Sequence, residues 1–376
     1  MNNIINYYRK IIEKSRSLRR TDLYLILAAI AVFVLVVSSV FFRRSDQSVR
    51  IDIVISQNSG HLFGMDVINA FIQEFEDQNP GLRVYLSDSE ADILFFDDSE
   101  IGSLLAGSAL APLDGAYYLP LVTFMDVFIY NIDLLQRAGR DRPPRTRTEF
   151  IAAARAVAAL PGTAYPLALG LYQVDAVRND IYPWIWAAGG DLRQDGDAVV
   201  LSRAAVDTIA FFGQLHREGL LAPGSFERSR AQRLGEFAKG DIAMMAVSSR
   251  DIPFLQSSSP FLDFGITAIP QLVQGRNRLA LSGIYAGISS NSAIPGEAQA
   301  FLSFVAERKL ALEETLSAVP GNVSVVFPGS YIMRDPLYLK AWDIFDAAYI
   351  VGHCPSDPLE EETGRIIMER LNEALR

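Results

Sequence analysis

The sequence has very little cysteine and histidine. Its 376 residues include one cysteine, Cys354, and three histidines, His61, His216 and His353. A single cysteine excludes an internal disulfide and gives no information on the redox compartment. The histidines are too few and too far apart in sequence to suggest a metal site, so we expect neither a metal ion nor a cofactor. A reactive Cys354 thiol in a loop before Pro355 is an alternative use of that residue.

The short motifs of common enzymes are also missing. The sequence has no Gly-x-Ser-x-Gly, no His-Glu-x-x-His and no phosphate loop ending in Gly-Lys-Ser or Gly-Lys-Thr. No pair of carboxylates can be placed face to face as glycoside hydrolysis requires. We therefore expect that the protein is not an enzyme.

Positive charge is scarce outside the N-terminal segment. The net charge is −10, although residues 1–50 hold nine Lys or Arg against three Asp or Glu, so the remaining residues are more acidic than the whole. Phosphate binding needs a basic footprint. The acidic body therefore excludes nucleic acid as the expected partner.

One long apolar run stands near the N-terminus. Leu23 to Phe42 contains no charged residue and no proline, and at about 1.5 Å per residue a helix there spans roughly 30 Å, the thickness of the bilayer core. A cleaved signal peptide is the alternative, but the run is long and lacks a small-residue cleavage site. Six Lys or Arg precede it and three follow. We expect a cytoplasmic tail (1–22), a single membrane helix (23–42), a linker (43–49) and a periplasmic body.

The body alternates strands with helices, which indicates the α/β class. We expect strands at 50–56, 82–86, 91–96 and 242–247, a polar loop at 57–64, and a helix that buries Ile68, Phe71 and Phe75. Ser202 is expected to cap a helix with Val206, Ile209, Phe212 and Leu215 inward. Thr146 and Glu149 form a capping box.

The stretch from Asp126 to Gly139 organises this arrangement. Val127–Tyr130 is typical of a strand buried on both faces, Asn131 can cap a short helix, and Gly139 can end it. Such a strand, cap and helix indicate a crossover in an α/β sheet. We expect the chain to leave one lobe here and start a second, with the ligand beside this segment.

Nine short sequence motifs follow one another along the body. They are Phe75–Val84, Ala91–Phe95, Leu110–Asp114, Ile129–Leu134, Pro144–Phe150, Trp186–Gly190, Glu218–Pro223, Phe237–Met245 and Phe264–Pro270. Each phrase is weak alone, but the series resembles the sugar-type extracellular solute-binding proteins of ABC importers, the maltose-binding-protein-like group.

The resemblance implies a two-lobed periplasmic binding protein fold of type II. Lobe 1 would comprise residues 50–128 and 265–308, and lobe 2 residues 129–264 and 309–376. Crossing strands near Val127–Tyr130 and Phe264–Ala268, with the helix around Val305–Leu312, would act as hinges. The lobes would close over a small carbohydrate and deliver it to ABC permease subunits, with a monomeric soluble portion.

The sequence departs from the family pattern at several points. Only Ser87–Glu90 separates two early phrases, so we expect a shortened first lobe. Arg147 and Arg250 stand where the family often has aromatic residues, and a membrane helix replaces the usual lipid anchor. These departures favour an alternative in which the fold has lost transport and serves as an extracytoplasmic interaction or sensing module.

Sugar recognition needs aromatic rings against C–H faces and polar groups for hydroxyls. Positions that match the family suggest Tyr130, Trp184, Trp186, Arg250 and Tyr285 as ligand-binding residues. Loops after the first and third strands add Asn58, His61, Asp97 and Asp98. These residues also have alternative roles. Tyr130 can be a core residue, and Trp184 and Trp186 would share one face of an extended run. Of the adjacent Asp97 and Asp98, only one is expected in the site. A buried Arg250 would favour an anionic ligand, and an exposed one a rim charge.

Overall fold

The structure, a computed structural model, describes residues 50–376 except 88–89, 114, 163, 175, 193–199, 273–277, 309–310, 313–334 and 354–359. The predicted cytoplasmic tail, membrane helix 23–42 and linker 43–49 lie outside the described residues, as does Cys354. No helix within the described ranges is long and apolar enough to span a bilayer. The membrane helix therefore stays a prediction.

The chain divides into two compact units, Met1–Asp52 with Asn79–Arg83, and Ile53–Gln78 with Val84–Arg376. In the described part of the first unit, the Ile51 N–H donates to the Gly81 carbonyl and the Leu82 N–H donates to the Asn79 carbonyl, both at 2.9 Å. The second unit contains every candidate site residue.

The described strands join in one sheet of order β2-β1-β3-β8-β4-β6-β5, with β7 also paired to β4 and β9 to β8. The strands are β1 (Ile51–Ser56), β2 (Leu82–Ser87), β3 (Ile93–Asp97), β4 (Leu119–Asn131), β5 (Tyr165–Leu167), β6 (Ile242–Ser248), β7 (Phe264–Thr267), β8 (Arg278–Ile288) and β9 (Tyr349–His353). The expected strands at 50–56, 82–86, 91–96 and 242–247 are confirmed within a residue or two.

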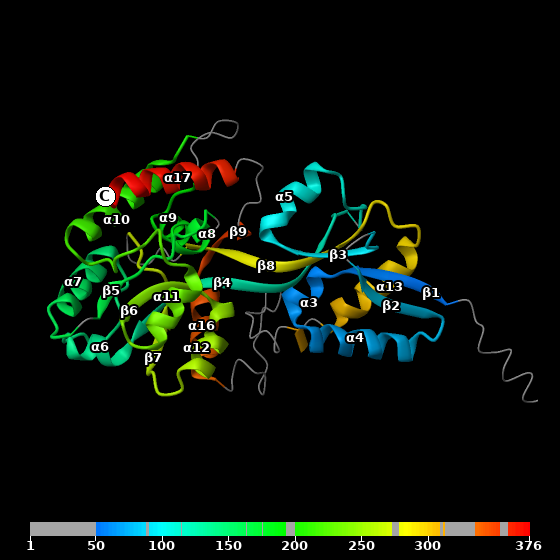
Figure 1. Ribbon diagram of the computed structural model, residues 1–376, viewed down its shortest axis with the longest axis horizontal. Coiled ribbons are helices and arrows are strands. Elements are labelled where there is room, and N and C mark those ends of the chain that lie inside the picture. The colour runs from blue at the N-terminus through cyan, green and yellow to red at the C-terminus, as the bar shows by residue number, and fades with distance from the viewer. Residues whose placement is uncertain are drawn as a thin grey trace, which may run out of the picture. The chain divides into compact units, whose positions relative to one another are not determined.

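Helices cover the sheet within two groups of elements (Figure 1). The first group contains α3 (Asn58–Phe63), α4 (Met65–Gln78), α5 (Asp98–Ala106) and α13 (Pro295–Glu307). The second contains α6 (Ile132–Arg137), α7 (Arg147–Ala158), α8 (Ala176–Asp180), α9 (Tyr182–Ala187), α10 (Arg203–Arg217), α11 (Arg230–Ala238), the 3-10 turn η1 (Ser249–Asp251), α12 (Ile252–Ser258), α16 (Pro336–Asp346) and α17 (Glu360–Ala374).

Strand β4 changes partners in its middle, and this change separates the two lobes. Leu119–Met125 pairs with β8, whereas Asp126–Tyr130 pairs with β6. The second half also pairs with β7, through Phe128–Asn131. The long strands β4 and β8 link the two groups of elements (Figure 1). Strand β8 pairs with β4 as far as Met125, and β7 pairs with it from Phe128 onward. The expectation that residues 264–268 form the second crossing strand stays a prediction.

Each lobe has an aromatic core. In the first lobe, Phe75 of α4 packs edge-on against Phe301 and Phe304 of α13, with ring centroids 5.0 and 5.2 Å apart. In the second, Trp184 of α9 lies 5.5 Å from Phe128 of β4, centroid to centroid. The apolar spacing along these helices accounts for the packing, because residues three and four apart share one helix face.

Several expected helix ends are confirmed. The Asn131 side chain accepts a hydrogen bond from the Leu134 N–H at 2.9 Å and begins α6, and Gly139 has a φ of 69° just after it. Ser202 likewise accepts from the Ala205 N–H and begins α10. The polar start of a helix can thus be predicted from a capping side chain followed by an apolar repeat.

Two local expectations need correction. Residues 57–64 are not a loop, since α3 forms there and buries Leu62 and Phe63, whose ring meets Phe95 at 5.5 Å. Val206 of α10 is 48% exposed, because the buried face of the helix is centred nearer Ala205 and Phe212.

The predicted capping box on α7 is half formed. Thr146 caps the Glu149 N–H at 3.2 Å, but Glu149 accepts from the Arg145 N–H and pairs with Arg142 rather than returning to the cap. The capping box fails because a nearby guanidinium competes for the Glu149 carboxylate.

Candidate functional site at the partner change of β4

Asp126 is the charged residue at the point where β4 passes from one lobe to the other. It faces Ser248 of β6 in the strand register and is partly buried. Its neighbours along the strand, Met125 and Val127, are fully buried and apolar. None of the described residues donates a hydrogen bond to its carboxylate, whereas buried polar groups are ordinarily paired. The strand therefore places a partly exposed carboxyl group at the lobe junction.

Asp98 approaches this junction from the first lobe. It is 4% exposed, and its carboxylate accepts hydrogen bonds from the Gly283 N–H at 2.7 Å and from the Tyr285 hydroxyl at 2.9 Å. A glycine is required at 283, because a β-carbon there would lie 2.7 Å from the Val122 carbonyl oxygen and 3.1 Å from the Tyr285 ring. Asp98 thereby ties the start of α5 to β8.

Arg230 supplies the positive charge on the side of the second lobe. Its guanidinium donates to Asp180 at 3.1 Å and to Asp251 at 2.5 Å. Asp180 also accepts from the Gly170 N–H at 2.6 Å. We call Asp98, Asp126, Asp180, Arg230 and Asp251 the junction cluster.

Burial raises the pKa of two carboxyl groups of the junction cluster, Asp98 and Asp126. Burial raises the pKa of Asp126 to about 8, because loss of water disfavours its charged form; Arg230 opposes this, while Asp251, Asp180 and Asp98 add to it. Burial also raises the pKa of Asp98 to about 6, although its two hydrogen-bond donors oppose the change. Two carboxyl groups at the lobe junction thus titrate near neutral pH.

The raised pKa of Asp126 predicts a pH-dependent stability. Because the pKa is higher in the folded chain than its ordinary value of 3.8, the folded chain retains a proton that the unfolded chain releases, and stability falls as pH rises toward about 8. Replacing Asp126 with Asn removes this titration. We expect urea unfolding, followed by tryptophan fluorescence, to give equal stabilities at pH 5 and a gain of about 1–3 kcal/mol for Asp126→Asn at pH 9. An equal difference at both values of pH would contradict the assignment.

Three more of the predicted site residues lie on the first lobe with Asp98. Asp97 caps α5, accepting from the Ser99 N–H at 2.8 Å, and its neighbour Asp98 turns toward β8, so the two side chains point apart as expected. Both amide hydrogens of Asn58 are engaged, with the Phe95 carbonyl at 3.2 Å and Glu100 at 3.1 Å. His61 lies within α3.

Arg250 begins on the second lobe and reaches the first. It is exposed, donates to the Leu62 carbonyl at 3.2 Å, and places its guanidinium 5.5 Å from the centroid of the Phe124 ring. Arg250 would favour an anionic ligand only if it were buried, and it is exposed. Arg250 acts instead as a polar link between η1 and α3.

Three of the predicted aromatic residues are buried, and one of these, Tyr285, contacts the junction cluster through Asp98. Trp184 is fully buried, Trp186 is 3% exposed and Tyr285 1% exposed. The run that contains both tryptophans is the helix α9, with Pro183 in its first turn, so the expected extended run is wrong. Their role in ligand binding stays a prediction.

Tyr130 lies further along β4, paired with Gly265, where a β-carbon would come within 2.4 Å of its hydroxyl. Burial raises its pKa, with Asp263 adding to the effect. Its ring lines a cavity of about 470 Å³ bounded by β7 and α16. Asp126 begins the segment of β4 that pairs with β6, and Tyr130 ends it. The cavity beside Tyr130 is therefore at the opposite end of this segment from Asp126.

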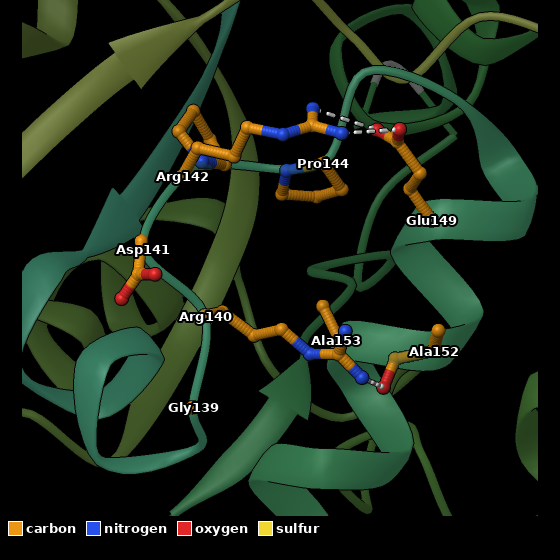
Figure 2. Close-up of a pocket in the computed structure, with 9 residues that line it drawn as sticks. Gly139, Arg140, Asp141, Arg142, Pro144, Glu149, Ala152 and Ala153 are labelled. Atoms are coloured by element: carbon orange, nitrogen blue, oxygen red, sulfur yellow. Dashed lines mark hydrogen bonds and ion pairs between the residues drawn. The ribbon is translucent and has the colours of Figure 1, made fainter.

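A second cavity of about 330 Å³ lies beside the loop after α6 (Figure 2). There Arg142 pairs with Glu149 at 2.8 Å, Arg140 donates to the Ala152 carbonyl at 3.0 Å, and Asp141 turns away from both (Figure 2). Its charged groups are thus engaged with one another or directed outward. Across the described ranges, no group of three or more His, Cys, Asp or Glu side chains is arranged to hold a metal ion.

Sequence reasoning missed Asp126, Asp180, Arg230 and Asp251 as site residues. A signal existed for Asp126, since it is the one charged residue in the thirteen-residue strand β4. No comparable signal marks the other three, because they come from separate elements and meet only in the folded chain.

Comparison with known proteins agrees with this architecture. The pattern of the bacterial extracellular solute-binding protein family matches residues 66–311. Binding proteins from Brucella abortus and Brucella suis are 31% identical to the chain over 168 residues, which cover 42% of this chain. The match spans only 39% of the length of these curated relatives.

Solved structures extend the likeness over most of the chain. The GacH receptor of Streptomyces glaucescens, solved unliganded and with acarbose, gives a TM-score of 0.68 at 17% identity and covers 86% of this chain and 92% of that one. MalE of Xanthomonas citri, described as a sugar-binding protein, gives 0.66 at 14% identity, with 86% and 97% coverage. UgpB of Mycobacterium tuberculosis, bound to glycerophosphocholine, gives 0.67 at 18% identity, with 87% and 98% coverage. These likenesses show a two-lobed periplasmic binding protein fold, and all three relatives are binding proteins rather than enzymes. With its family pattern spanning most of both lobes, the chain belongs to the bacterial extracellular solute-binding proteins.

Proposed function

We propose that the protein is a membrane-anchored extracytoplasmic solute-binding protein that captures a sugar or sugar-like molecule between its lobes for an ABC importer. The observation that carries the proposal is a partly exposed carboxylate, that of Asp126, at the point where β4 changes its pairing from one lobe to the other. A hydroxylated ligand supplies the O–H donors that such an acceptor needs.

The fold supports this proposal. Strands β4 and β8 both pass between the lobes, so a small rotation about them changes the separation of groups on either side. Structural relatives bind acarbose and glycerophosphocholine, two hydroxyl-bearing small molecules. Anchoring by residues 23–42, a periplasmic location of the body and a monomeric soluble portion complete the proposal, and the permease subunits would be its partners in the membrane.

Calorimetry tests the proposal directly. The full chain, held in lipid nanodiscs, is titrated with glucose, maltose, cellobiose, trehalose and their amino and N-acetyl derivatives. We expect saturable binding of at least one sugar, with one ligand per chain. If a chain shown to be folded by circular dichroism binds none of them, the sugar-binding function is wrong.

A second function has its own support in the burial of the predicted aromatic residues. Trp184, Trp186 and Tyr285 all lie in cores, and Arg250 links the two lobes without a ligand. This arrangement favours an interaction or sensing module that has lost transport. Crosslinking in intact membranes separates the two functions: a permease subunit as the captured partner supports import, and a partner of another class supports the module.

A further inference from the structure

We infer that the cavity beside Tyr130 is a second small-molecule site, and that it takes a hydroxylated aromatic carboxylate. The cavity has a volume of about 470 Å³ and is bounded by β4, β7, the loop before α7 and α16. Small-molecule sites typically have volumes of roughly 300–1,000 Å³. Because this cavity lies away from Asp126, the inference goes beyond the proposed capture of a sugar between the lobes and does not depend on it.

Gln271 gives the cavity a hydrogen-bond acceptor that the protein leaves unpaired. The residue lines the cavity and is 4% exposed. Its side-chain Nε2 donates to the Ile269 carbonyl at 2.5 Å, and this bond fixes which end of the amide is the oxygen. The side-chain Oε1 accepts from none of the described residues. Since buried polar atoms are ordinarily paired, this acceptor favours a ligand with an O–H or N–H donor.

The backbone holds Gln271 beside Arg145, which also lines the cavity. The Gln271 N–H donates to the Arg145 carbonyl at 2.9 Å, and the Arg145 N–H donates to the Glu149 carboxylate at 2.8 Å. The exposed Arg145 guanidinium, in contrast, makes no hydrogen bond or ion pair with any residue that the structure describes. A planar guanidinium on a fixed backbone is well suited to a ligand carboxylate.

The other charged groups at this cavity leave the preference for an anion in place. Lys340 and Asp343 of α16 lie 3.9 Å apart, and their side chains are 54% and 59% exposed. Together with Arg145 they give the lining two cations and one anion. The cavity after α6 differs, because its Arg142 is already paired with Glu149.

The walls between these polar groups are apolar and include one aromatic ring. The Tyr130 ring is held on one side by Gly265, where a β-carbon would lie 2.4 Å from the tyrosine hydroxyl. The apolar lining comprises Pro143, Ile266, Ala268, Ile344 and Ala347. A sugar would turn hydroxyl groups toward these walls at a cost, whereas a flat aromatic ring can pack against them and against Tyr130. A ring with a hydroxyl for Gln271 and a carboxylate for Arg145 therefore fits the lining.

Matched aromatic compounds test the inference. The full chain in lipid nanodiscs is titrated by calorimetry with 4-hydroxybenzoate and 4-hydroxyphenylacetate, which separate the two groups by different lengths, and with benzoate and phenol. We expect saturable binding of at least one hydroxy acid, with one ligand per chain. Benzoate lacks the donor for Gln271 and phenol lacks the carboxylate for Arg145, so each is expected to bind about tenfold more weakly. If neither hydroxy acid binds, or if benzoate or phenol binds as tightly, the inference is wrong.

Three variants locate the binding. Ala347 and Ala159 are exposed residues that follow the last turns of α16 and α7, and only Ala347 lines the cavity. Ala347→Trp is expected to block binding of the hydroxy acids, and Ala159→Trp to leave it unchanged. Arg145→Gln is expected to weaken binding of the hydroxy acids about tenfold without affecting phenol.

Circular dichroism shows that each variant is folded. If the folded Ala347→Trp or Arg145→Gln chain keeps the full affinity, the compounds bind elsewhere and the inference is wrong. The sugar titration is a separate measurement, so the proposed function stands or fails independently of these results.

Discussion

Replacing Arg230 with Met is expected to lower the free energy of unfolding by about 3–5 kcal/mol, because it removes the shared cation from two carboxylates. Asp180 has a side chain only 3% exposed and Asp251 one 21% exposed, so water cannot replace the guanidinium at the first. Burial raises the pKa of Asp180 even with Arg230 present. Urea unfolding at pH 7 followed by circular dichroism gives the measurement.

A double variant separates lost charge pairing from lost packing. Arg230→Met combined with Asp180→Asn removes the uncompensated charge at the more deeply buried of the two carboxylates, and the carboxamide keeps the shape of that side chain. We expect it to regain a large part of the stability, and the difference between single and double variants gives the interaction energy. A loss below about 1 kcal/mol in Arg230→Met would show that the pairs behave like exposed surface pairs, contrary to the burial of Asp180.

Much of the fold could be predicted from local patterns. The apolar alternation of β1 and β3, the capping by Asn131 and Ser202, and the glycine after α6 each depend on neighbours close in sequence. The helix α3 was missed for the opposite reason. Its polar, glycine-containing start indicates a loop, and the helix is stabilised by distant contacts such as that of Phe63 with Phe95 of β3.

The candidate site was less predictable because its members come from distant segments. Asp98 is bonded to a backbone amide 185 residues away, and Arg230 to a carboxylate 50 residues earlier. Contacts between residues so far apart in sequence produce no periodic pattern from which they could be predicted. Family resemblance favoured aromatic residues as ligand contacts, but Trp184 belongs to a core that the sequence could not distinguish from a binding surface, since both are rich in aromatic side chains.

Trp184→Ala is expected to destabilise the second lobe by about 3–5 kcal/mol, the usual cost of truncating a large buried aromatic residue. The indole is fully buried, with ring centroids of Phe128, Phe150, Phe211 and Phe212 between 5.4 and 5.6 Å away. Its backbone carbonyl also accepts from the buried Arg147, whose guanidinium lies 4.8 Å from the centroid of the Phe211 ring. Thermal and urea unfolding of the full chain give the measurement.

Trp184→Phe distinguishes a core residue from a ligand contact. Phenylalanine keeps an aromatic ring in the cluster, and no described residue accepts a hydrogen bond from the indole Nε1, so no such bond is lost. We expect a smaller loss of about 1 kcal/mol in stability and an unchanged affinity for whichever sugar the chain binds. A loss of affinity of about tenfold, 1.4 kcal/mol, at nearly unchanged stability would instead place Trp184 against the ligand. Because burial separates the indole from solvent, the first outcome is the one that the packing of α9 against Phe128 requires.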